Sequence, residues 1–98
     1  MTLPVVFHDL AGDELNEAAA YYARISPGLG EAFIAEVEHA VALLVDLPGA
    51  GREVESDLRW WVVKRFPYSI LYRERLDQIR ILAIAHQKRR PFYWRGSS

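Results

Sequence analysis

The apolar residues change their spacing once along this chain of 98 residues. Between residues 10 and 47 they recur every three or four positions, which is the period of an amphipathic helix. From residue 58 to residue 85 they alternate or form short continuous runs, which is the pattern of β-strands. Helices that precede a run of strands are typical of an α+β fold. We expect a chain of this length to form a single domain over residues 1–98.

The helical half is interrupted at Ser26-Pro27-Gly28. A first helix is predicted over residues 10–25, with Asp9 as its N-cap. A second helix begins either at this turn, with Pro27 in its first position, or after the turn has run on to Gly30. It ends near Leu47, because a proline and a glycine follow. The connection is short, so the two helices should form an antiparallel hairpin.

Four strands are predicted around this hairpin, in the order β-α-α-β-β-β. They cover residues 5–7, 58–66, 68–73 and 79–85, with a loop over residues 48–57. The three late strands should pair as an antiparallel meander, and the first strand should pair with one of them. The hairpin should pack on one face of this mainly antiparallel sheet. The last strand is apolar throughout, so we expect it to be central and covered on both faces. Residues 96–98 should be frayed.

The charges are divided between the two halves of the chain, although the net charge is only −1. Residues 1–58 contain 2 basic and 11 acidic side chains, a balance of −9. Residues 59–98 contain 10 basic and 2 acidic side chains, a balance of +8. Such asymmetry indicates an anionic partner for the second half. The alternative is that the two halves neutralise each other inside the fold.

Several classes of protein are disfavoured by what the sequence lacks. It has no cysteine, so disulfides and thiolate metal sites are excluded, and a reducing cytosol is the expected compartment. No apolar run approaches the ~18 residues of a membrane span, and the first residues lack the charged head of a signal peptide. The histidines His8, His39 and His86 do not have the spacing of a zinc site. No metal or cofactor is therefore expected.

The residues suited to chemistry or binding gather near the end of the chain. His86 ends the apolar strand and can exchange a proton near neutral pH. Arginine forks grip phosphate and aromatic faces stack on bases, so the tail is suited to nucleic acid. The alternative is that its aromatic residues anchor the C-terminus to the core. The paired carboxylates Glu14/Glu17 and Glu36/Glu38 are expected to lie on solvated helix faces. The basic and aromatic residues of the tail are Lys88, Arg89, Arg90, Phe92, Tyr93, Trp94 and Arg95.

In combination, several segments of the chain resemble the RelE/ParE superfamily of bacterial type II toxins. The likeness covers nearly the whole chain. It rests on Tyr21-Tyr22, Ser26 to Gly30, Phe33, Pro48 and Gly51, residues 63–73, residues 81–86, and the tail Arg89-Arg90-Pro91-Phe92-Tyr93-Trp94.

This resemblance implies a compact α+β toxin that a cognate antitoxin binds and neutralises as a hetero-oligomer in the bacterial cytoplasm. The Phe-Pro-Tyr turn, the tail and the modest pI of 6.3 favour the ParE side, whose members inhibit DNA gyrase without demonstrated nuclease chemistry. On that reading Arg73, Lys88, Arg89 and Arg95 contact the target.

Two alternatives remain at this stage. A RelE-like member would cut messenger RNA on the ribosome, with Arg65 and Arg90 stabilising charge and His86 or Tyr93 transferring protons, without a metal. A small nucleic-acid-binding domain would bind with an affinity that falls steeply with salt.

Overall fold

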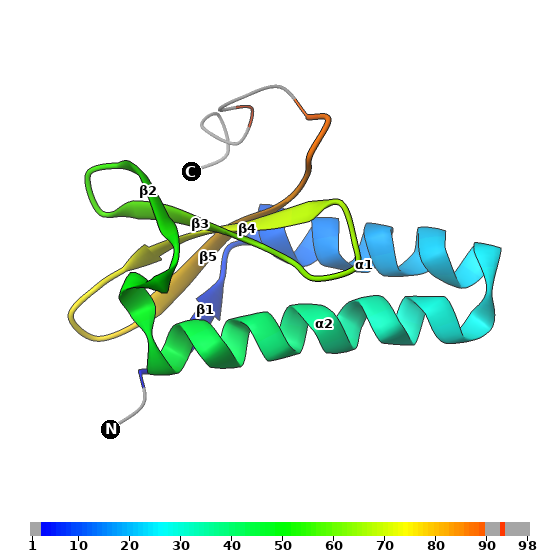
Figure 1. Cartoon of the computed structure of the whole chain (residues 1–98), viewed down its shortest axis with the longest axis horizontal. Coiled ribbons are helices and arrows are strands. Elements are labelled where there is room, and N and C mark those ends of the chain that lie inside the picture. Colours follow the sequence, from blue (N-terminus) through cyan, green and yellow to red (C-terminus); the bar gives the residue numbers. More distant parts are fainter. Residues whose placement is uncertain (1–2, 90–92, 94–98) are drawn as a thin grey trace.

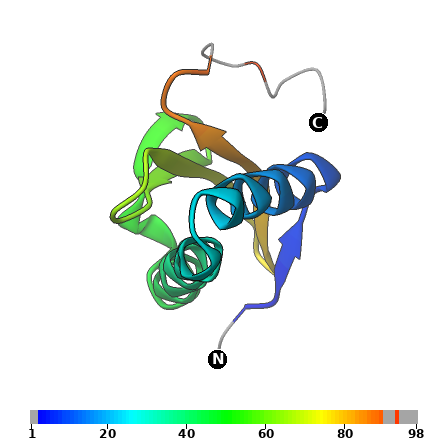
Figure 2. The ribbon, with the colours of Figure 1, turned by 90° about the vertical axis from the view of Figure 1, so that its right-hand side faces the viewer.

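The computed structural model describes residues 3–89 and Tyr93. The chain forms two layers, in which a hairpin of two long helices covers one face of a twisted sheet (Figures 1 and 2). This arrangement confirms the predicted α+β class. The elements are β1 (Val5–Phe7), α1 (Asp9–Ile25), α2 (Pro27–Asp46), the short 3₁₀ helix η1 (Pro48–Ala50), β2 (Arg52–Glu55), β3 (Leu58–Val62), β4 (Tyr68–Glu74) and β5 (Ile79–His86).

Within the described residues the sheet has five strands in the order β1-β5-β4-β3-β2. Strands β3, β4 and β5 form the predicted antiparallel meander. The first strand pairs with the last one, as expected, and runs parallel to it, with Val5 opposite Ile79 and Phe7 opposite Ile81. Strand β5 therefore lies inside the sheet, as its apolar sequence predicted.

The prediction of a four-stranded sheet was wrong by one strand. Residues 52–55 were expected in a loop, but they form the edge strand β2, which pairs with β3 from Arg52 opposite Trp60 onward. This strand is mostly exposed and carries charges, so it lacks the apolar alternation that marks a half-buried strand. The turn after it contains Asp57 at a φ of 56°, a conformation that aspartate tolerates better than most residues.

The helix ends differ slightly from prediction. The N-cap of α1 is His8 rather than Asp9, and the Leu10 amide donates a hydrogen bond to His8 Nδ1 at 3.4 Å. Ser26 occupies the cap position of α2 with Pro27 next to it, as predicted, although its side chain makes no capping bond. Because α2 starts directly at Pro27, the two helices are joined by a single residue.

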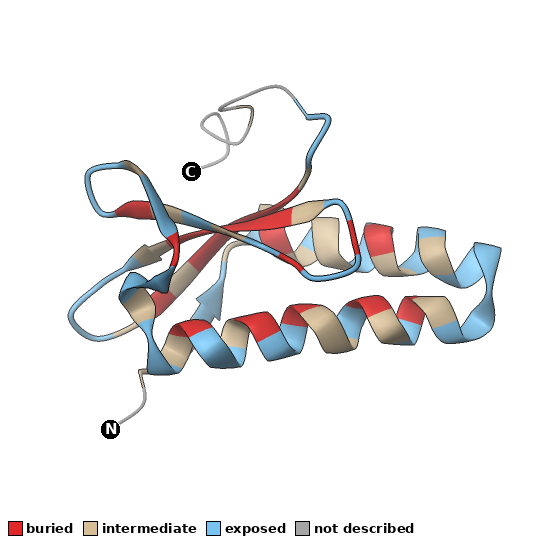
Figure 3. Cartoon of the chain, in the orientation of Figure 1, coloured by how far each residue is buried: buried red, intermediate tan, exposed pale blue. Residues whose placement is uncertain are grey.

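The main core lies between the helices and the sheet, where Figure 3 shows the buried residues facing inward. Its centre is a group of aromatic rings from α1, α2 and the start of β4. Phe33 is fully buried, and its ring centroid lies 5.1 Å from that of Phe66 and 5.0 Å from that of Tyr68. Tyr22 packs against Phe66 at 4.9 Å. Edge-to-face pairs of this kind each add about 0.5–1.5 kcal/mol beyond the area that they bury.

A second apolar cluster lies on the outer face, which we define as the sheet face away from the helices. Tyr93, Leu10 and Val54 pack against it. Since Ile84 belongs to the main core and Ala83 to this cluster, β5 is buried on both faces, as predicted. The buried members of the second cluster are Leu58, Leu71, Leu82, Ala83 and Ala85.

Tyr72 fastens η1 to the sheet. This fully buried residue donates its hydroxyl proton to the Pro48 carbonyl at 2.7 Å and accepts the Gly51 amide at 2.9 Å. A Cβ atom on Gly51 would collide with the Tyr72 hydroxyl and lie 2.8 Å from the Trp60 carbonyl oxygen. These contacts fix the place where the chain leaves α2 and enters β2.

The close approach of the two helices requires a glycine. A Cβ atom on Gly30 would lie 2.7 Å from the Ala19 carbonyl oxygen and 3.0 Å from the Ala23 Cβ. Gly12, in α1, has nothing within 4 Å of the same position.

We therefore predict opposite effects for two alanine substitutions in helices. Gly30→Ala forces the helices apart and should lower the free energy of unfolding by about 1–3 kcal/mol. Gly12→Ala gains helix propensity without a clash and should raise that free energy by up to about 1 kcal/mol. Urea denaturation followed by tryptophan fluorescence measures both. Equal effects of the two substitutions would contradict the packing described.

Candidate binding site at the end of β5

A shallow depression of about 260 Å³ lies where α1 meets the start of β4 and the end of β5. It combines carboxylates from the helix with aromatic and basic side chains from the sheet and the turn after it. The lining residues are Glu14, Glu17, Ala18, Tyr21, Tyr68, Ile84, His86 and Arg89.

Glu14 joins three parts of the chain at this depression. Its Oε1 atom accepts the Ile84 amide proton at 2.9 Å, and its Oε2 atom accepts the Tyr93 hydroxyl proton in a short hydrogen bond. Strand β1 ends at Phe7, opposite Ile81, so Ile84 lies beyond the last residue of its neighbouring strand. The carboxylate thus supplies the acceptor that a longer β1 would have provided.

Burial and hydrogen bonding shift the proton affinities of this pair. Burial raises the pKa of Glu14 above 4.5, while the Tyr93 hydroxyl, the Ile84 amide and the Arg89 charge act in the opposite direction. Burial, and then the hydrogen bond to Glu14, strongly raise the pKa of Tyr93. The phenol therefore keeps its proton at neutral pH and donates it to the carboxylate.

The turn after β5 is organised by His86. Its Nδ1 atom accepts the Lys88 amide at 3.0 Å, its carbonyl accepts the Arg89 amide at 3.0 Å, and its ring packs edge-on against Tyr68 at 5.1 Å. The turn places the Arg89 guanidinium 4.1 Å from the centroid of the Tyr93 ring. Lys88 and Arg89 are both exposed at this end of the sheet.

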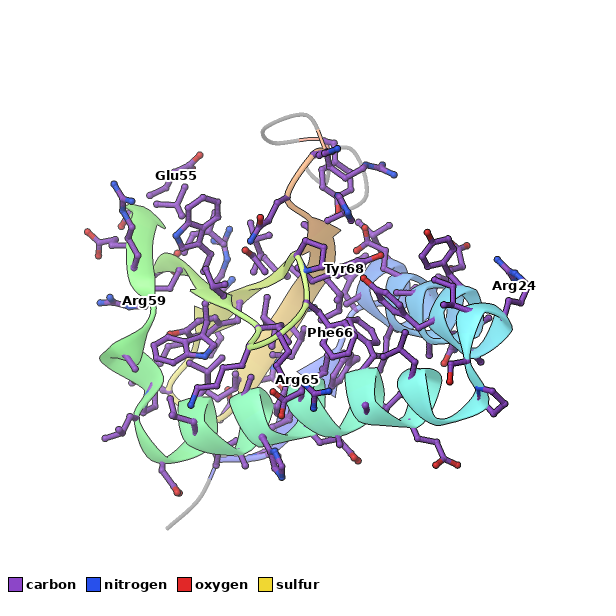
Figure 4. The ribbon with its side chains drawn as sticks, turned by 45° about the vertical axis from the view of Figure 1, so that its right-hand side comes forward. Arg24, Glu55, Arg59, Arg65, Phe66 and Tyr68 are labelled. Carbon is purple, nitrogen blue, oxygen red and sulfur yellow. The ribbon has the colours of Figure 1, made fainter. Side chains whose placement is uncertain are left out.

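Of the residues predicted for catalysis, the structure brings His86 and Tyr93 to this depression but not Arg65. His86 lines it, and Tyr93 reaches it through Glu14. Arg65 lies in the connection between β3 and β4 and is absent from the lining. Figure 4 shows Arg65 beside α2. Its guanidinium carbon lies 5.8 Å from the centroid of the Phe66 ring. Arg90 falls outside the described residues.

The predicted target-binding residues are also divided. Lys88 and Arg89 share the exposed turn, whereas Arg73 lies on β4 and donates a hydrogen bond to Asp57 at 3.1 Å. Arg73 is therefore held in an ion pair within the sheet. Arg95 lies outside the described residues.

The prediction of a solvated helix face was wrong for Glu14, which is half-buried and hydrogen-bonded. The signal was present, since Glu14 follows the buried Ala11 by three residues and precedes the buried Ala18 by four. Glu17 and Glu38 are exposed, as predicted. The prediction was also wrong for Glu36, whose side chain is only 16% exposed and lies 3.5 Å from that of the exposed His39.

Salt bridges neutralise part of the charge of the two halves, at Glu53 and Asp57 of the acidic half. Within residues 3–89, the bridges of the basic half join Arg59 to Glu53, and Arg73 and Arg75 to Asp57. All three connect neighbouring parts of β2, β3, β4 and their turns, and none joins the helical hairpin to the sheet. The helical layer thus remains acidic, and the far end of the sheet remains basic.

In the described part of the chain, neither helix is long and apolar enough to cross a membrane. No three histidine, aspartate or glutamate side chains among those residues lie close enough to hold a metal ion.

The fold and this site define a small α+β domain in which a helical hairpin covers one face of a five-stranded sheet. The solved structure of the "Chromosomal ParDE TA system from P. aeruginosa" matches 87% of this chain and 96% of that chain, with a TM-score of 0.74 and 24% identity, a likeness in fold. The comparison with curated proteins gives no match. The family described as "ParE toxin of type II toxin-antitoxin system, parDE" matches residues 5–91. The chain belongs to this family and is a type II toxin.

The Glu14 pair predicts a pH-dependent contribution to stability. A carboxyl with a raised pKa in the folded state stabilises the fold most below pH 4.5, and this contribution is lost as the pH rises through the folded value. Glu14→Gln should remove this pH dependence of the free energy of unfolding. Glu14→Ala should in addition lower the free energy of unfolding by about 1–3 kcal/mol, because the Ile84 amide loses its acceptor. Denaturation curves between pH 4 and 8 measure both effects. The exposed Glu38→Gln variant, on the other helix, should keep the pH dependence, so the same loss there would refute the assignment.

The backbone conformation of Arg65 allows a second test. Its φ is 71°, a left-handed conformation that is costly for a residue with a Cβ. Arg65→Gly should raise the free energy of unfolding by up to about 1 kcal/mol. Its neighbour Lys64 has no positive φ, so Lys64→Gly should lower it by about 0.5–1 kcal/mol. Thermal denaturation distinguishes the two variants. A loss at Arg65 equal to that at Lys64 would show that the position is unstrained.

Proposed function

We propose that this toxin inhibits DNA gyrase by binding to it, and that a cognate antitoxin neutralises it in a hetero-oligomeric complex in the bacterial cytoplasm. The observation that carries the proposal is the ParE family match over residues 5–91, which spans nearly the whole chain. Growth inhibition then follows from occupancy of the target and needs no chemical step by the toxin.

The geometry at the end of β5 supports binding over cleavage of RNA. Cleavage needs a group that takes the proton of the attacking 2′-hydroxyl, together with cations beside the phosphate. The Tyr93 proton is held by Glu14, and His86 Nδ1 is occupied by the Lys88 amide. The cation expected from Arg65 lies on a different connection of the fold, beside Phe66.

The residues on the outer face of the sheet also favour binding to a protein. Trp60 and Val62 are 39% and 53% exposed there, and Ser69 lies between Val62 and Ala85 in the cross-strand register. Exposed tryptophan beside aliphatic side chains is typical of protein interfaces, whereas phosphate recognition calls for cations. The exposed cations Lys88 and Arg89 at the rim would steer an acidic surface of the target towards this end.

Induction of the chain alone in bacteria tests the target. We expect lost plasmid supercoiling and filamentation, with messenger RNA left uncut. Lys88→Glu reverses a charge at the proposed contact and should weaken inhibition of purified gyrase at least about tenfold. Arg24→Glu is the matched control, because this exposed arginine lies at the far end of α1 (Figure 4), and inhibition should stay within about twofold of the parent.

Prompt translation arrest with cut messages would overturn the proposal in favour of a ribonuclease. Equal effects of the two charge reversals would place the gyrase contact elsewhere on the molecule.

A further inference from the structure

The turn that carries Lys88 and Arg89 is held by backbone hydrogen bonds and by one side chain. The Gln87 amide donates to the Pro67 carbonyl at 2.9 Å, and the Arg89 amide donates to the His86 carbonyl at 3.0 Å. The amide between them, that of Lys88, donates to His86 Nδ1 at 3.0 Å. His86 therefore accepts two of the three amides of the turn, and its side chain is the acceptor for the middle one.

The hydrogen bond to Nδ1 fixes the protonation state of the imidazole ring. A backbone amide can only donate, so Nδ1 must carry a lone pair, and the proton of the neutral ring lies on Nε2. A doubly protonated imidazole has no acceptor. Uptake of a proton by His86 would therefore replace this hydrogen bond by a contact between two donors, and it would add a positive charge beside Lys88 and Arg89.

The fold holds the ring in the orientation that this hydrogen bond needs. His86 is half-buried at the end of β5, opposite Tyr68 on β4. The two rings pack edge to face, with centroids 5.1 Å apart and an interplanar angle of 86°. Tyr68 in turn packs against the fully buried Phe33, at 5.0 Å between centroids. The His86 ring thus rests on the aromatic core, and its orientation does not depend on the exposed turn.

Charges of both signs surround the imidazole. Carboxylates of α1 favour its protonated form, and the cations of the turn favour its neutral form. Histidine is the side chain that titrates between about pH 5 and 8, so the hydrogen bond to Lys88 can be broken in that range. The titratable and charged groups beside His86 are Glu14, Glu17 and Tyr21 of α1, Tyr68 of β4, and Lys88 and Arg89 of the turn.

We propose that His86 is a positioning residue for gyrase inhibition, whose neutral ring fixes the turn that presents Lys88 and Arg89 and whose protonation releases this turn. A contact segment that is ordered before binding loses less conformational entropy in the complex, so the fixed turn binds more tightly. His86 acts through the turn and needs no contact with gyrase. The inference rests on the proposed function, which assigns Lys88 and Arg89 to the contact.

The tautomer of the ring is measured on the purified toxin alone. A two-dimensional ¹H–¹⁵N spectrum that correlates the ring nitrogens with the carbon-bound ring protons distinguishes the two neutral tautomers. At pH 8 we expect the proton of His86 on Nε2 and a lone pair on Nδ1. A neutral ring with its proton on Nδ1 would overturn the inference, because such a ring cannot accept the Lys88 amide.

Two substitutions separate the hydrogen bond from the imidazole. An asparagine side chain accepts the amide two residues further along the chain, as in an Asx turn, and it does not titrate. At pH 8, His86→Asn should inhibit purified gyrase within about twofold of the parent, whereas His86→Ala should inhibit about threefold to tenfold more weakly, the factor expected for one hydrogen bond. Both are compared as folded proteins, which thermal denaturation establishes. Equal inhibition by the two variants would overturn the inference.

The pH dependence of inhibition is a readout that a merely structural role of His86 would not move. Between pH 8 and pH 6, inhibition by the parent should weaken about twofold or more relative to that by His86→Asn, because only the parent loses its acceptor. The ratio removes the pH dependence of gyrase itself. His39→Asn is the matched control, because this side chain on α2 is 81% exposed, and it should keep the pH dependence of the parent. Identical pH profiles of the parent and His86→Asn would overturn the inference.

The inference and the proposed function fail differently. If the ring has the expected tautomer but the chain does not inhibit gyrase, the proposed function is wrong and the positioning role falls with it. If the chain inhibits gyrase but neither His86→Ala nor the change in pH alters the inhibition, the target stands and the positioning role is wrong.

Discussion

The length of β1 sets the arrangement of the functional end of this protein. With only residues 5–7 in the strand, β5 loses its parallel neighbour after Ile81, although it continues to His86. An unpaired edge in the middle of a core is costly unless its amides find acceptors. Helix α1 starts two residues after the end of β1 and runs past this edge, where Glu14 accepts a hydrogen bond from the Ile84 amide. The same carboxylate also accepts a hydrogen bond from the Tyr93 hydroxyl. The early end of β1 therefore also determines where Tyr93 is held.

The two layers also separate the charges. The helices supply most of the acidic residues, and the sheet with its tail supplies most of the basic ones, while the buried residues between them are apolar. Within residues 3–89 the salt bridges of Arg59, Arg73 and Arg75 lie among β2, β3, β4 and their turns, while Lys88 and Arg89 are exposed at the end of β5. A molecule with an acidic side and a basic end orients itself in the field of a charged partner, which favours fast and directional association.

The sequence predicted what depends on periodicity, and it missed what depends on tertiary contacts. The helical hairpin, the meander and the burial of β5 on both faces follow from apolar spacing alone. Strand β2 has no such spacing, because an edge strand is defined by its partner rather than by its own burial. Glu14 was misjudged because a carboxylate on a helix is normally solvated, and only the strand end opposite it changes that. The sequence likewise does not give the position of Arg65, in the β3–β4 connection, relative to His86, at the end of β5.

The register of the sheet joins the apolar and the basic parts of the outer face. Val62 lies opposite Ser69 on β4, and Ser69 lies opposite Ala85 on β5, directly before His86 and the basic turn. Adjacent strands are about 4.8 Å apart, so Val62 and the end of β5 are separated by about 10 Å across β4. A surface that packs on Trp60 and Val62 therefore lies within reach of Lys88 and Arg89. Because β4 and β5 are paired along their whole length, the distance between the apolar and the basic part is fixed by the sheet and does not depend on a change in conformation.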